Sequence, residues 1–156
     1  MKKTVVVCTF LVVVLTALIT LNIYLNYEVI KDDISDVELK TSVGAVSSRF
    51  PMLENHIEKT YWKGDVLSKK GIGPSVYWMK GFIEVDEMYT EQLRNSYEWI
   101  EAEIHFKKGF DQDVLEYDEY NWCTSREFSK AILIGFIGGF YFDTINGVIY
   151  FDVENL

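Results

Sequence analysis

The sequence predicts an α+β protein: an N-terminal transmembrane helix, then a small domain with an antiparallel sheet of about four strands, a C-terminal β-hairpin and two or three helices. Three observations support this prediction. The chain starts with a long uncharged apolar segment, its middle alternates between helical and strand-like periodicity, and its end places two β-rich runs around Asn146-Gly147. We expect residues 1–27 to form a signal-anchor and residues 28–156 to form one acidic, exported domain.

The N-terminal segment has the length of a membrane span. Residues 4–24 carry no charge, and roughly 20 apolar residues are needed to cross the hydrocarbon core as a helix. Lys2 and Lys3 precede this segment and acidic residues follow it, which favours a cytoplasmic amino terminus. We therefore expect a single-pass protein of a bacterial inner membrane with its C-terminal domain in the periplasm. The alternative is secretion to the periplasm after signal cleavage, but the end of the segment lacks the small residues of a cleavage site.

Four later segments have helical spacing of apolar residues. Asp86 and Ser125 are good N-terminal caps for two of them, and Pro51 ends another. The predicted helical segments are residues 32–50, 53–61, 87–99 and 125–133.

Strand-like alternation occurs at residues 75–86, with a possible bulge at Gly81, and at residues 100–106. Residues 138–153 contain the two runs of the hairpin, since Asn-Gly is the strongest short-range hairpin signal. Residues 63–75 and 109–121 are predicted loops, the second of them acidic.

Charge excludes one large class of function. Lys2 and Lys3 lie before the apolar segment, so 13 of the 15 basic residues remain against 24 acidic ones, a net charge of −11. Such a domain lacks the basic surface that nucleic-acid binding requires. A partner selected by charge would be basic.

The sequence predicts no metal, no cofactor and no disulfide. Cys8 lies inside the apolar segment, far from Cys123, and His56 and His105 have no second ligand at metal-binding spacing. The acidic run also fails as a calcium loop, because Leu115 stands where an EF-hand needs an oxygen ligand. No nucleophile motif occurs, so an enzyme is not expected.

The acidic loop is the candidate binding site for a protein partner. In general architecture the chain resembles small membrane-held immunity proteins, which protect bacteria from exported toxins that act on the envelope. This resemblance implies occlusion of the basic active site of an exported toxin or envelope enzyme. Two alternatives are an accessory subunit of a secretion or division complex, and a cell-wall module that binds or hydrolyses glycans. The predicted partner-binding residues are Asp111, Asp113, Glu116, Asp118, Glu119, Tyr120 and Trp122.

Overall fold

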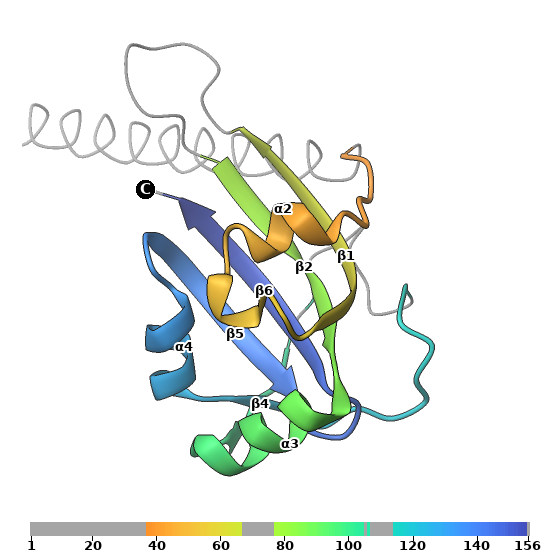
Figure 1. Ribbon diagram of the computed structural model, residues 1–156, viewed down its shortest axis with the longest axis vertical. Coiled ribbons are helices and arrows are strands. Elements are labelled where there is room, and N and C mark those ends of the chain that lie inside the picture. Colours follow the sequence, from red (N-terminus) through yellow and green to blue (C-terminus); the bar gives the residue numbers. More distant parts are fainter. Residues whose placement is uncertain (1–36, 67–76, 105, 107–113, 156) are drawn as a thin grey trace, which may run out of the picture. The chain divides into compact units, whose positions relative to one another are not determined.

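Six antiparallel strands form one sheet in the part of the chain that the computed structural model describes, namely residues 37–66, 77–104, 106 and 114–155 (Figure 1). All of these residues belong to one compact unit, Val37–Leu156. In spatial order, the strands are β1 (Ile57–Val66), β2 (Tyr77–Val85), β6 (Val148–Asn155), β5 (Phe136–Asp143), β4 (Trp122–Thr124) and β3 (Ile100–Glu101).

The predicted α+β architecture with about four strands was wrong. The described residues are mostly antiparallel sheet with six strands, and their helices are few and short. The two strands that were not predicted are β1, most of which was expected to be helix or loop, and β4, whose three residues are too few for periodicity to reveal. The helical elements are α2 (Val43–Ser47), the 3-10 helix η1 (Pro51–Leu53), α3 (Glu87–Ser96) and α4 (Arg126–Ile132).

The segment at residues 53–61 was predicted to be a helix, but most of it belongs to β1. Thr60 and Trp62 are buried while their neighbours Lys59 and Tyr61 are not, which is the two-residue period of a strand. The strand also takes residues 63–66 from the predicted loop, whereas residues 67–75 lie outside the described residues. Tertiary pairing with β2 therefore overrides the weak local helical pattern.

The predicted membrane span, residues 4–24, lies outside the described residues, as do residues 32–36. Where the structure is described, no helix is long and apolar enough to cross a membrane. In the described part of the helix predicted at residues 32–50, which is residues 37–50, only Val43–Ser47 is helical, and Lys40 forms a two-way backbone bridge with Trp62 at 2.7 and 2.8 Å. Among the described residues of the strand predicted at residues 100–106, which omit residue 105, only Ile100–Glu101 pairs as a strand.

Three local predictions were confirmed. The Asp86 carboxylate accepts a hydrogen bond from the Tyr89 backbone N–H at 2.7 Å and caps α3, and Ser125 caps α4 in the same way. The two C-terminal runs form the hairpin of β5 and β6. Gly147 lies in its turn at φ 72°, a conformation that strongly favours glycine.

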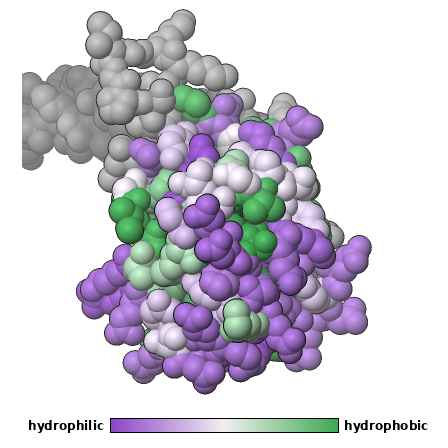
Figure 2. All heavy atoms as spheres, viewed as in Figure 1, coloured by the Kyte–Doolittle hydropathy of each residue, from purple (hydrophilic) through white to green (hydrophobic). Residues whose placement is uncertain are grey.

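One face of the sheet is covered by the helices and holds the main core (Figure 1). Phe50, which follows α2, is fully buried, with ring centroids 5.2 Å from Phe140 and 5.3 Å from Phe151. α3 and α4 add Tyr89, Leu93, Phe128 and Ile132 to this core. Because these side chains are buried, the helices serve chiefly to cover this face of the sheet. On the side shown in Figure 2, the outer surface is mostly hydrophilic, with hydrophobic residues in separate patches.

The opposite face of the sheet holds a second, smaller apolar cluster. Its buried members are Phe82, Leu115, Trp122, Val148 and Tyr150, which come from three strands and from the segment before β4. Phe106 packs against this cluster, with its ring centroid 5.1 Å from that of Tyr150. Phe106 and Leu115, from the connection between β3 and β4, therefore cover part of the second face, and this places residues 114–121 against the sheet.

Candidate functional site

Residues 114–121, here called the acidic segment, are attached to the second face of the sheet by their apolar side chains. Leu115 is only 5% exposed and lies in the cluster with Phe82 and Val148. Glu116, Asp118 and Glu119 are exposed. The segment thus has an apolar inner side and presents carboxylates to solvent.

Aromatic side chains of the acidic segment pack against each other and against β4. The rings of Tyr120 and Trp122 stack with centroids 5.7 Å apart and planes 5° from parallel. Tyr117 lies edge-on to Tyr120, and its hydroxyl donates to the Glu84 carboxylate at 3.5 Å. Burial and the nearby Glu84 carboxylate raise the pKa of Tyr117, so its phenol stays protonated at neutral pH. The tyrosine rings of the acidic segment therefore fix it to Trp122 of β4 and to Glu84 of β2.

A second attachment joins the acidic segment to the β5–β6 turn through Asp143, a fully buried residue. Its carboxylate accepts hydrogen bonds from the Asn121 backbone N–H at 2.8 Å, the Ile145 backbone N–H at 3.1 Å and Asn146 Nδ2 at 2.6 Å. Asn146 Nδ2 also donates to the backbone carbonyl of Glu119 at 2.7 Å. Both ends of the stretch from Glu119 to Asn121 are therefore fixed to the turn.

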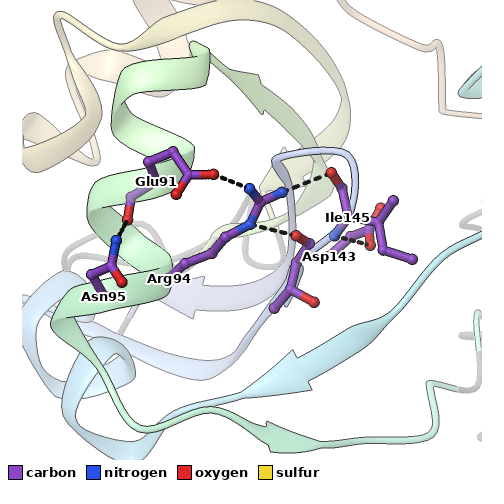
Figure 3. A network of polar contacts seen from close by, with 6 residues as sticks. Glu91, Arg94, Asn95, Asp143 and Ile145 are labelled. Atoms are coloured by element: carbon purple, nitrogen blue, oxygen red, sulfur yellow. Dashed lines mark hydrogen bonds and ion pairs between the residues drawn. The ribbon is translucent and has the colours of Figure 1, made fainter.

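α3 holds the same turn from its other side. Figure 3 shows Arg94 reaching from α3 to the turn, where its guanidinium donates to the backbone carbonyls of Thr144 at 2.6 Å and Ile145 at 2.8 Å. Glu91, one helical turn earlier, forms an ion pair with Arg94. α3, the turn and the acidic segment thus form one connected polar network, in which carbonyls that no strand partner uses are satisfied.

The structure separates the sequence-predicted site residues into three groups. Glu116, Asp118 and Glu119 are exposed together in the acidic segment, and Tyr120 is half-buried beside them. Trp122 lies in β4 and is only 9% exposed, so it supports Tyr120 from the cluster and offers little surface to a partner. The remaining two predicted residues, Asp111 and Asp113, lie outside the described residues.

An open hollow on the second face, here called the sheet hollow, was missed by the sequence analysis. It has a volume of about 380 Å³ and lies over β5 and β6, with Ile104 at its side. Three facing pairs form its floor and ends: Ile137 with Glu154, Gly139 with Asp152, and Tyr141 with Tyr150. The signal that could have revealed it is the alternation Ile137, Gly139, Tyr141, which leaves a gap at the middle position of one strand face.

His56 forms a structural contact with a carboxylate. His56 Nδ1 lies 2.9 Å from Asp86 Oδ2, and the imidazole stacks on the Tyr89 ring at a centroid distance of 4.0 Å. The backbone N–H of Tyr89 and the His56 side chain lower the pKa of Asp86. This arrangement stabilises an ionised N-terminal cap of α3.

The described part of the chain holds no group of three or more His, Cys, Asp or Glu side chains placed to bind a metal ion. Cys123 is buried in β4, and its burial raises the pKa of the thiol, which disfavours the nucleophilic thiolate. What the described surface offers is exposed carboxylates on a fixed backbone and an acidic, aromatic hollow, both of which suit the binding of cations and basic surfaces.

No protein-family model, no curated protein and no solved structure matches this chain. Its function is therefore inferred from its own residues.

Proposed function

We propose that this chain is a membrane-anchored protein-binding module of the bacterial envelope, which binds a basic exported protein and occludes its active site. The partner would be a toxin or an envelope enzyme. One observation carries the proposal: Glu116, Asp118 and Glu119 are exposed on a backbone that Leu115, Asp143 and Asn146 hold in place. A loop that is already ordered loses less conformational entropy on binding, so more of its contact energy contributes to affinity.

The charge of the whole domain supports the same partner class. A net charge of −11 over residues 28–156 attracts basic proteins over several ångströms and accelerates their encounter. Exposed Glu101 and Glu103, in and just after β3, add carboxylates near the same end of the sheet, where the Ala102 backbone N–H donates to the Trp122 carbonyl at 2.9 Å. Charge would set the rate of association, and the fixed geometry of the acidic segment would set the docking position.

The apolar segment at residues 4–24 is the proposed membrane anchor. Its test is fractionation of cells that express the full chain, followed by alkaline extraction of the membranes. An anchored protein stays in the extracted membranes with its N-terminal methionine intact. Recovery of a shortened chain from the periplasm would instead support signal cleavage.

The partner is tested by affinity capture with the tagged full chain from detergent-solubilised envelopes at low and high salt. The site variant is Glu116→Gln/Asp118→Asn/Glu119→Gln. The matched control is Glu38→Gln/Glu54→Gln/Glu58→Gln, which removes three exposed carboxylates from other parts of the domain and changes net charge equally. Three surface charges at about 0.5 kcal/mol each correspond to an approximately tenfold loss of affinity.

A basic exported protein that is retained by wild type and control, but about tenfold less by the site variant, would support the proposal. Equal retention by both variants would overturn the role of the acidic segment. A partner that depends on residues 4–24 alone would favour an accessory subunit of an envelope complex. Retention of cell-wall glycans without protein would favour a wall-binding module.

A further inference from the structure

We propose that the sheet hollow binds the side chain of an arginine that a basic protein partner presents. This inference rests on the proposed function, because it assumes a protein partner, and it adds a contact separate from the acidic segment. It is carried by the shape of the hollow, by the rings and apolar side chains at its edges, and by the carboxylates on β6.

The shape of the hollow follows from a missing side chain. Gly139 faces Asp152 across the β5–β6 ladder, with Ile137 and Tyr141 on either side of it on the same strand face. A Cβ atom at Gly139 would lie 3.3 to 3.7 Å from Cε2, Cζ and the hydroxyl oxygen of Tyr141, so the Tyr141 side chain lies close to the glycine backbone. The floor is therefore the backbone around Gly139 together with the Tyr141 side chain that lies against it.

The edges of the hollow suit the apolar stem and the planar head of arginine. Ile137 is 46% exposed, and Ile104 lies at the side of the hollow, so both offer apolar surface to a methylene chain. The half-buried Tyr141 ring forms one end, and the Tyr150 ring, which is only 3% exposed, lies behind it at a centroid distance of 5.9 Å. A guanidinium group stacks favourably on such rings and is more weakly hydrated than an ammonium group.

The described residues that line the hollow carry negative charge. Asp152 and Glu154 lie on the same face of β6, two residues apart, which places them about 7 Å from each other along the strand. Lys80 Nζ lies 3.4 Å from Asp152 Oδ2 and offsets part of that charge, whereas Glu154 is exposed at the opposite end from the tyrosines. A guanidinium group in the hollow would stack on the aromatic end and donate hydrogen bonds to the Glu154 carboxylate, because its fork of N–H donors matches a carboxylate.

The size of the hollow fits a single long side chain. Its volume of about 380 Å³ is near the lower limit of ligand pockets, which run from about 300 to 1,000 Å³. Between the described residues it is partly open to solvent, as a side chain that arrives from another protein requires.

The test is NMR titration of the isotope-labelled full chain in detergent micelles with a capped Gly-Arg-Gly peptide. The matched probe is the same peptide with citrulline, which has nearly the shape of arginine and no charge. The expected result is saturable shifts of the backbone amides of Gly138, Gly139, Tyr141 and Glu154, with affinity at least about tenfold lower for citrulline. Equal affinity for the two peptides, or shifts confined to residues 116–119, would overturn the proposal.

Two variants probe the hollow in different ways. Gly139→Leu fills the floor and should abolish the shifts, provided that its amide spectrum retains wild-type dispersion. Glu154→Gln removes one exposed carboxylate without changing shape and should weaken binding about threefold. Glu38→Gln, which removes an exposed carboxylate before α2, is the control and should leave binding unchanged. Undiminished binding by both hollow variants would overturn the proposal, as would amide shifts produced by chito-oligosaccharides but not by the arginine peptide.

The same variants distinguish failure of this inference from failure of the proposed function. If envelope capture is lost in the acidic-segment variant but is unaffected by Glu154→Gln and Gly139→Leu, the hollow is excluded and the proposed function stands. If the arginine peptide binds in the hollow but no basic protein is captured, the arginine site stands and its assignment to a protein partner is overturned.

Discussion

The side chain of Asn146 donates from Nδ2 to the backbone carbonyl of Glu119 at 2.7 Å. One residue is in the turn of the C-terminal hairpin and the other is in the acidic segment, 27 positions earlier in the chain. The same Nδ2 donates to the Asp143 carboxylate at 2.6 Å, so a single amide group ties the segment to the buried centre of the turn. The hairpin is therefore both the centre of the sheet and the support of the candidate binding surface.

Replacement of Asn146 by alanine should loosen this attachment. It removes two hydrogen bonds, one of them to a carboxylate, and leaves the buried Asp143 with one donor fewer. We expect a loss of about 1–3 kcal/mol in the free energy of unfolding, measured in urea. Asn55→Ala changes an exposed asparagine in another turn and should stay within about 0.5 kcal/mol of wild type. An Asn146→Ala variant with the wild-type free energy of unfolding would show that the turn does not support the acidic segment.

Leu115→Ala should destabilise the acidic segment from its inner side. The side chain is 5% exposed in the second cluster, and removal of a buried leucine typically costs about 2–5 kcal/mol. Limited proteolysis should then cut near residues 114–121 before the rest of the domain. Ile134→Ala is the control, because that side chain is 80% exposed and its removal leaves no cavity. Equal protease resistance of Leu115→Ala and wild type would show that the cluster does not hold the segment.

Local chemistry in the sequence was enough to predict the features that depend on neighbouring residues. Asp86 and Ser125 cap helices because a short polar side chain can accept a hydrogen bond from a backbone N–H three residues later, whatever the rest of the fold. The hairpin follows from Asn146-Gly147 and the β-rich runs on either side of it.

Features that depend on distant residues were not predictable from periodicity. Residues 57–61 were predicted to be helical from their local pattern, whereas their strand register is fixed by pairing with β2, which places Tyr61 opposite Phe82. The sheet hollow needs Gly139 on β5 and Asp152 on β6 to face each other, which only the strand pairing reveals. The acidic residues of the candidate site were visible as composition, but the attachment of the segment through Leu115 depends on a tertiary contact.

The Asp86 carboxylate that caps α3 should make the free energy of unfolding depend on pH in the acidic range. The pKa of Asp86 is lowered in the folded protein by the Tyr89 backbone N–H and by His56, so its carboxylate stabilises the fold when ionised. This contribution is fully present above the unfolded pKa of about 3.9 and is lost as the pH falls through the folded pKa. The difference in unfolding free energy between wild type and Asp86→Ala should be about 1 kcal/mol at pH 7 and should shrink below about pH 4.

Urea unfolding of both proteins at several pH values between 7 and 2.5 measures this difference. Glu58→Gln, which removes an exposed carboxylate of β1, is the control and should give a difference close to zero throughout. A difference for Asp86→Ala that does not change with pH would contradict the role of the ionised carboxylate. It would leave only side-chain packing as the contribution of Asp86.

Two glycines with opposite surroundings test the packing between β1 and β2. A Cβ atom at Gly81 would lie 2.4 Å from the Tyr61 carbonyl oxygen and 2.6 Å from the Trp62 Cβ. The pairing of β1 with β2 is regular at this position, so Gly81 is required by close approach and not by the bulge that the sequence suggested, which was wrong. Gly81→Ala must displace a neighbouring strand and should cost about 1–3 kcal/mol or more.

Gly44, in α2, is the matched control. A Cβ atom there would meet nothing within 4 Å, and alanine is favoured over glycine in a helix, so Gly44→Ala should stabilise the protein by about 0.5–1 kcal/mol. Thermal and urea unfolding should therefore shift in opposite directions for the two substitutions. Because both replace glycine with alanine, a difference in sign isolates the effect of crowding at Gly81 from any general effect of the substitution. If both variants were stabilised, β1 could not lie as close to β2 as the contacts of Gly81 require.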